Sequence, residues 1–435
     1  MVVPNTCLRA MSFFAVLLGC SRAVHAQIDL ERAPFSYTNT TPTDSVTQLR
    51  VSLDSGETTL DFDETHGYLV ALLKQLKVPV SSQVLVFSKT SFQRHYISPN
   101  SPRALYFNDD VYVGWVQRGD VIELSSADPN LGAVFYTLDQ QPTRGPRIQR
   151  QTDHCLSCHA SANTRRVPGH VVRSVYPDRG GLPLLRAGTF RTDHTSPLRE
   201  RWGGWYVSGT HGRDRHMGNV VAKSKEDPEQ LDVETGANVE NLCGLFNVEP
   251  YLSSHSDLVA LMVLEHQTAM HNRLTEAVYA GRSAIHDNEL MNRTLGRPAG
   301  FVSDSTKRRF DSAAMKVVDC LLMKDEYRLM DPVHGSSPFA EEFTARGPFD
   351  SQGRTLRHFD LQRRLFRYPL SYLIYSSAFE ALPEQVRRIV YRQLWNTLKS
   401  TNREDDYQHL STGDRTAIRE ILAETKSDLP AYWAG

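Results

Sequence analysis

Apolar residues alternate with polar ones in short segments through the first half of the chain. Four of these segments carry the β-branched and aromatic residues typical of strands: 83–87, 110–116, 121–124 and 133–138. Glycine, proline and aspartate separate them, and this combination indicates half-buried antiparallel strands joined by tight turns. We therefore expect a β-rich region over residues 46–240, interrupted by one helix near residues 68–76.

In the second half of the chain the apolar positions recur with the spacing of a helix. Asp257 can cap a helix that runs to Ala280, with Gly281 as its stop. Four further helices are expected, at 307–324, 369–382, 384–398 and after a capping box formed by Ser411 and Asp414. The pattern predicts a helical domain over residues 250–435. The fold class is therefore α+β, with a β-rich N-terminal half followed by an all-helical C-terminal half.

The N-terminus has the features of an export signal. Residues 1–26 combine an early arginine without acids, an apolar run too short to span a bilayer, and small residues before Gln27. This pattern predicts a secretory signal peptide cleaved after Ala26, followed by a flexible lead-in at 27–45. The stretch before Cys20 also resembles a lipobox, which would attach a lipid anchor to that cysteine. No later segment of the sequence is apolar for long enough to form a transmembrane helix.

Composition narrows the class of partner. Forty-nine basic residues nearly balance fifty acidic ones, and a formal net charge of −1 gives no basis for binding nucleic acid. The 435 residues are enough for two domains or one large one. Of the six cysteines, Cys243 and Cys320 stand alone, and they could pair with each other in an oxidising compartment.

A C-x-x-C-H motif occupies residues 155–159, with its thiols at Cys155 and Cys158 and its imidazole at His159. Two thiols at this spacing can add to the two vinyl groups of a porphyrin, and the adjacent imidazole can ligate its iron. A C-x-x-C pair can also be a redox-active dithiol or half of a zinc site. Zinc normally needs a second ligand pair at short spacing, and a dithiol normally follows a buried strand, whereas residues 142–150 are polar and breaker-rich. The motif therefore favours covalent haem attachment.

Through this motif the chain resembles c-type cytochromes, in particular the large monohaem proteins described as cytochrome c domain-containing. The resemblance implies one covalently bound haem c, with thioether bonds at Cys155 and Cys158 and with His159 as the proximal iron ligand. Bacteria attach haem covalently outside the cytoplasm. The expected location is therefore the periplasm or another exported compartment, or the membrane surface if Cys20 is acylated.

The ligand on the opposite face of the haem would decide the function, because a strong sixth ligand favours electron transfer and a vacant position admits small molecules. Met217 lies on a Gly-flanked loop, at about the distance after the motif where small c-type cytochromes carry a methionine ligand. His216 and His211 lie on the same stretch, and His266 lies on an apolar stripe of the helix expected after Asp257. Each of these residues could instead pack in the core or lie at the surface without contacting a haem. Two loop histidines stay open as well: His170 and His194.

Other residues near the motif could contact a haem. Arg165, Arg166 and Arg173 could pair with haem propionates by charge-assisted hydrogen bonds, or could be solvated surface residues. An aromatic cluster at 202–206 could line the haem, although core packing is the commoner role of such residues.

Two functions follow from an exported monohaem chain. The first is electron transfer by a c-type cytochrome with an unidentified redox partner protein. The second is catalysis by a haem peroxidase or another small-molecule haem oxidoreductase, whose distal position is open or weakly held. The chain is longer than a simple electron carrier needs, yet no distal acid–base signature stands out in it. A zinc or dithiol protein without haem is the third alternative.

Overall fold

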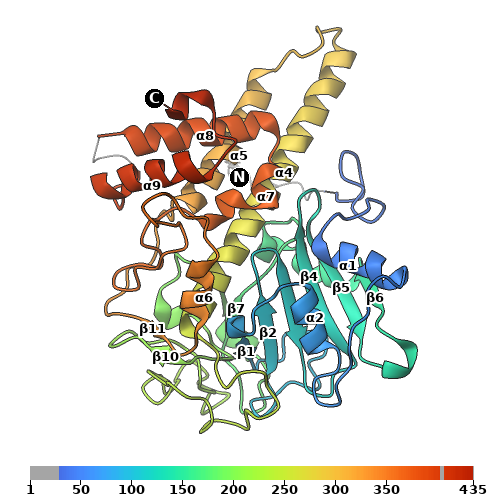
Figure 1. Cartoon of the computed structure of the whole chain (residues 1–435), viewed down its shortest axis with the longest axis vertical. Helices are drawn as coiled ribbons and strands as arrows, with labels where there is room; N and C mark the ends of the chain where they lie inside the picture. Colours follow the sequence, from blue (N-terminus) through green and yellow to red (C-terminus); the bar gives the residue numbers. More distant parts are fainter. Residues whose placement is uncertain (1–28, 402–405, 435) are drawn as a thin grey trace, which may run out of the picture.

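A computed structural model describes residues 29–401 and 406–434 of the chain. It contains a sheet-rich half and a helix-rich half, which meet along one long helix (Figure 1). The expected signal peptide at 1–26 and the candidate lipid anchor at Cys20 lie outside the described residues. Within those residues, no helix is both long and apolar enough to cross a membrane.

The main feature of the N-terminal half is a seven-stranded antiparallel sheet with the order β6-β5-β4-β3-β2-β1-β9. Its strands are β1 Val84–Val86, β2 Arg103–Phe107, β3 Val111–Trp115, β4 Val121–Asp128, β5 Gly132–Asp139, β6 Ile148–Gln151 and β9 Trp205–Tyr206. Two small sheets pair β7 Arg173–Val175 with β8 Thr189–Arg191, and β10 Gly209–Thr210 with β11 His334–Gly335. The four strands expected from the alternating pattern correspond to β1, β3, β4 and β5.

The helices of the described chain lie mainly in its second half. The α-helices are α1 Ser45–Asp54, α2 Leu69–Gln75, α3 His154–His159, α4 Leu258–Thr294, α5 Asp304–Leu321, α6 Phe339–Ala345, α7 Ser377–Glu380, α8 Glu384–Lys399 and α9 Thr412–Thr425. Short 3-10 helices are η1 Val80–Ser82, η2 Pro142–Arg144, η3 Ala162–Thr164, η4 Leu185–Ala187, η5 Leu198–Glu200, η6 Tyr372–Tyr375 and η7 Ala431–Ala434. The expected fold class is confirmed, because an antiparallel sheet region at 84–210 precedes a mainly helical region at 258–425.

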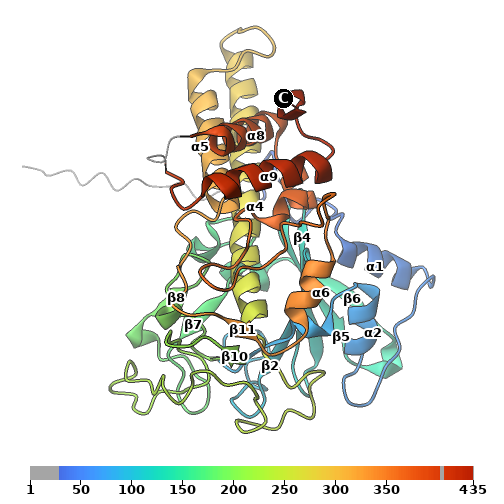
Figure 2. The same ribbon diagram turned by 60° about the vertical axis from the view of Figure 1, so that its left-hand side comes forward.

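The two faces of the main sheet have different surroundings, because successive side chains of a strand point to opposite sides. The first face carries a row of buried residues that includes Val113, Leu124 and Tyr136, and it packs against α1 and α2. The second face carries Tyr112 and Phe135, and α4 lies on this side of the sheet (Figure 2). We call it the second sheet face, and the candidate functional residues gather on it.

Helix α4 connects the two halves of the molecule. Asp257 caps its N-terminus, as the sequence predicts. The helix does not stop at Gly281, which was the expected end, but continues to Thr294. A Cβ at Gly281 would lie 2.8 Å from Pro383 Cγ, at the start of α8. The glycine therefore permits close packing of α4 against α8 instead of ending the helix.

Two other elements differ from the expected ones for local reasons. Residues 45–54 form α1 instead of continuing the strand pattern, because the Asp44 side chain accepts hydrogen bonds from the first backbone N–H groups of the helix. The helix expected at 369–382 is instead η6 followed by the four-residue α7, and Ser371 and Ser376 cap these two turns separately. The capping box expected at the start of α9 is confirmed.

The segment before α1, expected to be a flexible lead-in, is attached to the core from both sides. Tyr37 is fully buried and donates a hydrogen bond to the carbonyl of Ala133 on β5 at 2.8 Å. Phe35 stacks on Tyr279 of α4 with ring centroids 4.3 Å apart. These two aromatic side chains fix the segment between sheet and helix, an outcome that a composition rich in Thr, Pro and Ser did not suggest.

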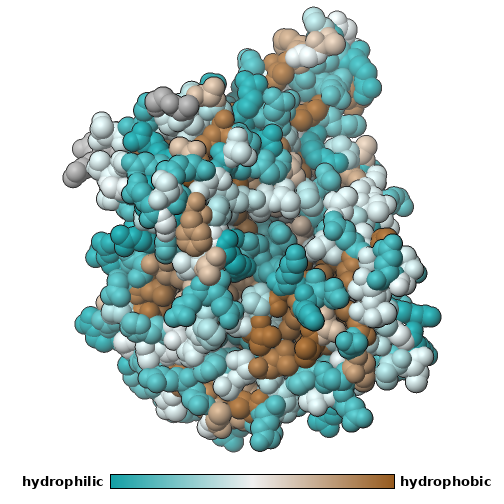
Figure 3. Space-filling model, in the orientation of Figure 1, coloured by the Kyte–Doolittle hydropathy of each residue, from teal (hydrophilic) through white to brown (hydrophobic). Residues whose placement is uncertain are grey.

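The far end of α4 projects beyond the rest of the fold together with α5 (Figures 1 and 3). Exposed apolar side chains occur there at Leu290, Met291, Leu295 and Phe301. The remainder of the visible surface is a mixture of polar and apolar side chains (Figure 3).

Candidate functional site

Helix α3 carries the three chemical groups of the C-x-x-C-H motif. It follows β6, the edge strand of the main sheet, and none of its six residues is buried. The thiols of Cys155 and Cys158 are free. Cys155 and His159 are four residues apart, so they lie on the same side of the helix. The motif is therefore presented at the edge of the sheet and is accessible to a bound molecule.

The environment of His159 fits a metal-ligating imidazole. Its Nδ1 donates a hydrogen bond to the carbonyl oxygen of Gly169 at 2.9 Å. A carbonyl oxygen can only accept, so Nδ1 carries the proton and Nε2 keeps a lone pair for a metal. The ring packs against Phe135 on the second sheet face, with centroids 4.7 Å apart. The partial burial of the His159 ring lowers its pKa, which favours the neutral form of the imidazole that binds metals.

An ion pair on the second sheet face lies beside the motif. Arg103 and Glu123 are 2.6 Å apart, and any Cβ at Gly114 between them would collide with the guanidinium. The charges of this pair act on the pKa of both Cys155 and His159, so the pair is within electrostatic reach of α3. Arg103 Nε is buried and has no hydrogen-bond partner among the described residues. This unused donor is available to an acidic group of a bound molecule.

Cys155 lacks the lowered pKa of a redox-active thiol. Burial and the nearby charge of Glu123 raise the pKa of Cys155 to about 11. Catalytic C-x-x-C dithiols depend on a lowered thiol pKa, which supplies thiolate near neutral pH. Cys155 is therefore protonated near neutral pH and lacks the thiolate on which disulfide exchange depends.

His170 lies close to His159, and a second histidine, His271, lies beside His170 with ring centroids 6.1 Å apart. His170 packs near the same Phe135 ring, with centroids 6.2 Å apart, and lies 4.3 Å from the ring of Tyr112. The Tyr112 hydroxyl is hydrogen-bonded to Nδ1 of His271 on α4 at 2.8 Å. Burial lowers the pKa of His170 well below its usual range and that of His271 to about 4, so both are neutral. His170 Nδ1 and His271 Nε2 are buried without a partner among the described residues.

Sequence reasoning named His170 only as an open alternative and gave His271 no separate role. The nearness of His170 to His159 comes from the bond between Gly169 and His159, which folds the loop back on α3. His271 faces the sheet because α4 crosses its second face, and helical periodicity does not show which neighbour a buried stripe will meet. The sequence feature that could have identified His170 is its short distance along the chain from the motif.

Met217, His216 and His211 form a sealed cluster. The rings of His211 and His216 are 4.8 Å apart, and His216 packs on Trp202 at 5.3 Å. Met217 is 3% exposed, and its Sδ accepts a hydrogen bond from Ser174 Oγ at 3.5 Å. Burial lowers the pKa of His216 to about 3. These contacts fit the core-packing interpretation of this stretch.

His266 lies in the interior, between α4 and η6. Its Nε2 is 2.7 Å from the Ser371 hydroxyl, and its Nδ1 is 3.4 Å from Nδ1 of His194. A buried ion pair joins Arg201 to Glu265 of the same helix at 2.9 Å. His266 is therefore part of a buried polar network that links the two halves.

None of the four sequence-derived candidates for a sixth ligand is joined to α3 by a hydrogen bond or ring contact among the described residues. Those candidates are Met217, His216, His211 and His266. The aromatic cluster at 202–206 is buried, and Trp205 donates to the carbonyl of Arg173 at 2.8 Å, as core packing requires.

No protein-family model, curated protein or solved structure matches this chain. In the part of the chain that the structure describes, no group of three or more His, Cys, Asp and Glu residues is placed to hold a metal ion. The function is therefore inferred from the residues of the site themselves.

Proposed function

We propose that this protein is an exported monohaem c-type cytochrome that binds one haem covalently and transfers electrons. The observation that carries the proposal is α3, where two free thiols at C-x-x-C spacing adjoin an imidazole whose Nδ1 is held by a carbonyl. Cys155 and Cys158 would form the thioether bonds, and His159 would be the proximal ligand. When bound, the haem iron would supply the one-electron chemistry.

The surrounding residues orient and complement the motif. The hydrogen bond from His159 to Gly169 fixes the ring orientation and makes Nε2 a better electron donor. Phe135 supports one side of the imidazole ring. The buried, unpaired Nε of Arg103 can bind an acidic group. These residues prepare the site without taking part in covalent chemistry.

The proposed location is the periplasm or another exported compartment, because the sequence carries a signal-peptide pattern at 1–26. A membrane-tethered lipoprotein acylated on Cys20 is the alternative. Mass spectrometry of the mature N-terminus separates the two cases. An unmodified Gln27 at the N-terminus indicates ordinary cleavage, and an acylated Cys20 indicates the lipoprotein.

Haem attachment is tested by co-expression with the bacterial machinery that attaches haem covalently. We expect a coloured protein whose haem stays with the chain in denaturant. The double variant Cys155→Ser, Cys158→Ser should lose all covalent haem. Cys243→Ser is the matched control, because Cys243 is an exposed free thiol outside the motif, and it should keep the haem.

A haem peroxidase or another small-molecule haem oxidoreductase is the second candidate. The observation that favours it is a pair of buried, neutral histidines, His170 near His159 and His271 beside His170, with His170 Nδ1 and His271 Nε2 unpaired among the described residues. A neutral histidine next to a reactive centre can accept a proton from a small substrate. Tyr112, hydrogen-bonded to His271, would belong to the same site.

Carbon monoxide binding to the reduced protein distinguishes the two functions. An electron carrier with a strong sixth ligand should not bind carbon monoxide readily, and an enzyme with an open position should. The contacts of Met217 argue against a role as the sixth ligand, because its thioether is buried and accepts a bond from Ser174. We therefore expect Met217→Ala to leave the visible spectrum unchanged. A changed spectrum would make Met217 the ligand.

A further inference from the structure

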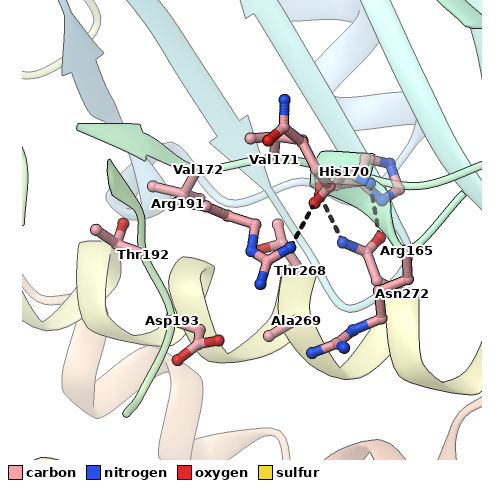
Figure 4. Close-up of a pocket in the computed structure, with 11 residues that line it drawn as sticks. Arg165, His170, Val171, Val172, Arg191, Thr192, Asp193, Thr268, Ala269 and Asn272 are labelled. Carbon is pink, nitrogen blue, oxygen red and sulfur yellow. Dashed lines mark hydrogen bonds between the residues drawn. The ribbon is translucent and has the colours of Figure 1, made fainter. Parts of the chain in front are cut away.

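A small pocket opens between the loop after α3, strand β8 and helix α4. The pocket is small and partly open to solvent, so it can hold a group of only a few atoms. Figure 4 shows Arg165 and Arg191 reaching toward it, and Thr268 and Asn272 of α4 on its lower side. Asp193 also lines the pocket. The charged groups around this pocket do not balance one another.

Positive charge exceeds negative charge at the pocket. The carboxylate nearest to Arg165 is Glu276 at 3.9 Å. Glu276 already pairs with Arg273 at 2.6 Å and with Lys316 at 2.9 Å, so three cations share one carboxylate. Burial lowers the pKa of Arg165, and the neighbouring arginines Arg273 and Arg191 lower it further. A cation in these surroundings is stabilised by a bound anion.

Arg191 adds a second guanidinium. Its Nη1 donates only long hydrogen bonds, of 3.4 Å to the carbonyl of Ala162 and 3.3 Å to that of Asn163. These two bonds hold the side chain over the pocket (Figure 4). The other guanidinium nitrogen atoms remain available for an oxyanion, which guanidinium groups bind in a bidentate manner.

The backbone that positions Arg165 is strained. Arg165 and Arg166 have φ values of 61° and 64°, so two consecutive residues with side chains adopt the left-handed conformation. Each such residue costs free energy that the surrounding structure must offset. The Thr164 hydroxyl, which donates to the carbonyls of His159 at 3.0 Å and Ser161 at 3.1 Å, braces this turn.

Asp193 is the one carboxylate among the described residues that line the pocket. Its Oδ1 accepts hydrogen bonds from the Thr195 backbone at 2.9 Å and the Thr195 hydroxyl at 2.7 Å. Oδ2 makes none of the hydrogen bonds assigned within the described chain. A carboxylate in the lining of a pocket repels a fully ionised anion but accepts a hydrogen bond from an anion that keeps a proton.

We propose that this pocket binds a small oxyanion that retains an ionisable proton, of which inorganic phosphate is the probe. The two guanidinium groups of Arg165 and Arg191 bind its ionised oxygens, and Asp193 Oδ2 accepts its remaining proton in a hydrogen bond. The inference does not depend on haem attachment, because no residue of α3 lines the pocket.

The test is calorimetric titration of the purified full-length protein with phosphate, and separately with sulfate, at constant ionic strength. We expect Arg165→Gln and Arg191→Gln each to weaken phosphate binding about tenfold or more, as loss of a charge-assisted bond predicts. Arg199→Gln is the matched control, since the Arg199 side chain is 76% exposed and is not part of the pocket. Phosphate should bind more tightly than sulfate, and Asp193→Asn should remove that preference. Unfolding temperatures show that each variant is folded.

Three results would overturn the proposal. The first is no saturable phosphate binding to the wild-type protein at millimolar concentration. The second is an equal loss of binding in Arg199→Gln, which would mean general attraction to positive charge. The third is a haem-loaded protein that does not bind phosphate but changes its midpoint potential in Arg165→Gln, because a haem carboxylate would then occupy the pocket. A protein that binds phosphate yet carries no haem would refute only the proposed function.

Discussion

Helices α3 and α4 both carry histidines, but they place them in opposite surroundings. α3 has six residues and buries none of them, whereas α4 has 37 residues and is buried along most of its length before Gly281. His159 on α3 makes its hydrogen bond to a backbone carbonyl and keeps Nε2 for a ligand. His266 and His271 on α4 contact other side chains in the interior. The short helix therefore presents its side chains at the edge of the sheet, whereas the long helix contributes mainly to the interior.

A leucine-to-alanine substitution in each helix should give the largest difference in stability between the two helices. Leu274 of α4 is fully buried, and Leu274→Ala should lower the free energy of unfolding by about 2–5 kcal/mol. Leu156 of α3 is only partly buried, and Leu156→Ala should cost about 1 kcal/mol or less. Urea unfolding followed by circular dichroism measures both values. Equal losses would contradict the division between the helices.

Acid should destabilise the interior through its neutral histidines. Burial lowers the pKa of His271 from 6.5 to about 4. Between these values the unfolded chain binds a proton and the native chain does not, so stability is lost as the pH falls from about 6.5 to about 4. The full contribution of this one group is about 3 kcal/mol. Glu265, whose pKa burial raises to about 7, acts in the opposite direction.

The variant His271→Asn isolates this effect. It should reduce the loss of stability between neutral pH and pH 4, measured by urea unfolding at several pH values. His95→Asn is the control, because His95 is exposed, and its pH dependence should match the wild type. If the free energy of unfolding of His271→Asn falls with pH as steeply as that of the wild type, His271 is not held neutral by burial.

Two glycine-to-alanine changes test the packing of α4 against α8. Alanine favours a helix by about 1 kcal/mol over glycine. At Gly281 the new Cβ would lie 2.8 Å from Pro383 Cγ and 3.1 Å from Val386 Cγ2, and such overpacking costs about 1–3 kcal/mol. Gly281→Ala should therefore lower the unfolding temperature. Gly413→Ala in α9 should raise it, because the nearest atom to its Cβ is 3.8 Å away. A higher unfolding temperature in both variants would contradict the packing role of Gly281.

The smallest expected effect concerns the contact between the sheet and α4. Tyr112→Phe removes the hydroxyl that bonds His271 and accepts from Gln267, and should cost about 1 kcal/mol. Tyr432→Phe, at a side chain that is 39% exposed, should have no measurable effect on stability. Thermal unfolding of both variants gives the comparison. A loss of haem in Tyr112→Phe would show that Tyr112 belongs to the haem site.

The sequence predicts the elements whose signals are local. Alternation identifies β3, β4 and β5, Asp257 marks the start of α4, and Ser411 marks the start of α9. Gly281 was misread as a stop, because a glycine that permits close packing has the same local signature as one that ends a helix. The C-x-x-C-H motif is likewise local, and its residues stay together on α3.

The rest of the candidate site depends on tertiary contacts that no local pattern encodes. His170 reaches the neighbourhood of His159 through the loop closed at Gly169, and His271 on α4 meets His170 with ring centroids 6.1 Å apart. Met217, which its spacing from the motif suggests as a sixth ligand, stays a prediction, because spacing along a chain does not fix the distance between residues in space. The structure packs Met217 against Ser174.

The central claim, covalent attachment of one haem to α3, is tested most directly by the intact mass and absorption spectrum of the purified protein under denaturing conditions. The chain should be produced together with the haem attachment machinery. The account predicts a mass increase of one haem and a reduced-haem spectrum that persist in denaturant and disappear in the double variant Cys155→Ser, Cys158→Ser. A colourless chain of unmodified mass, or a haem that the double variant keeps, would contradict it.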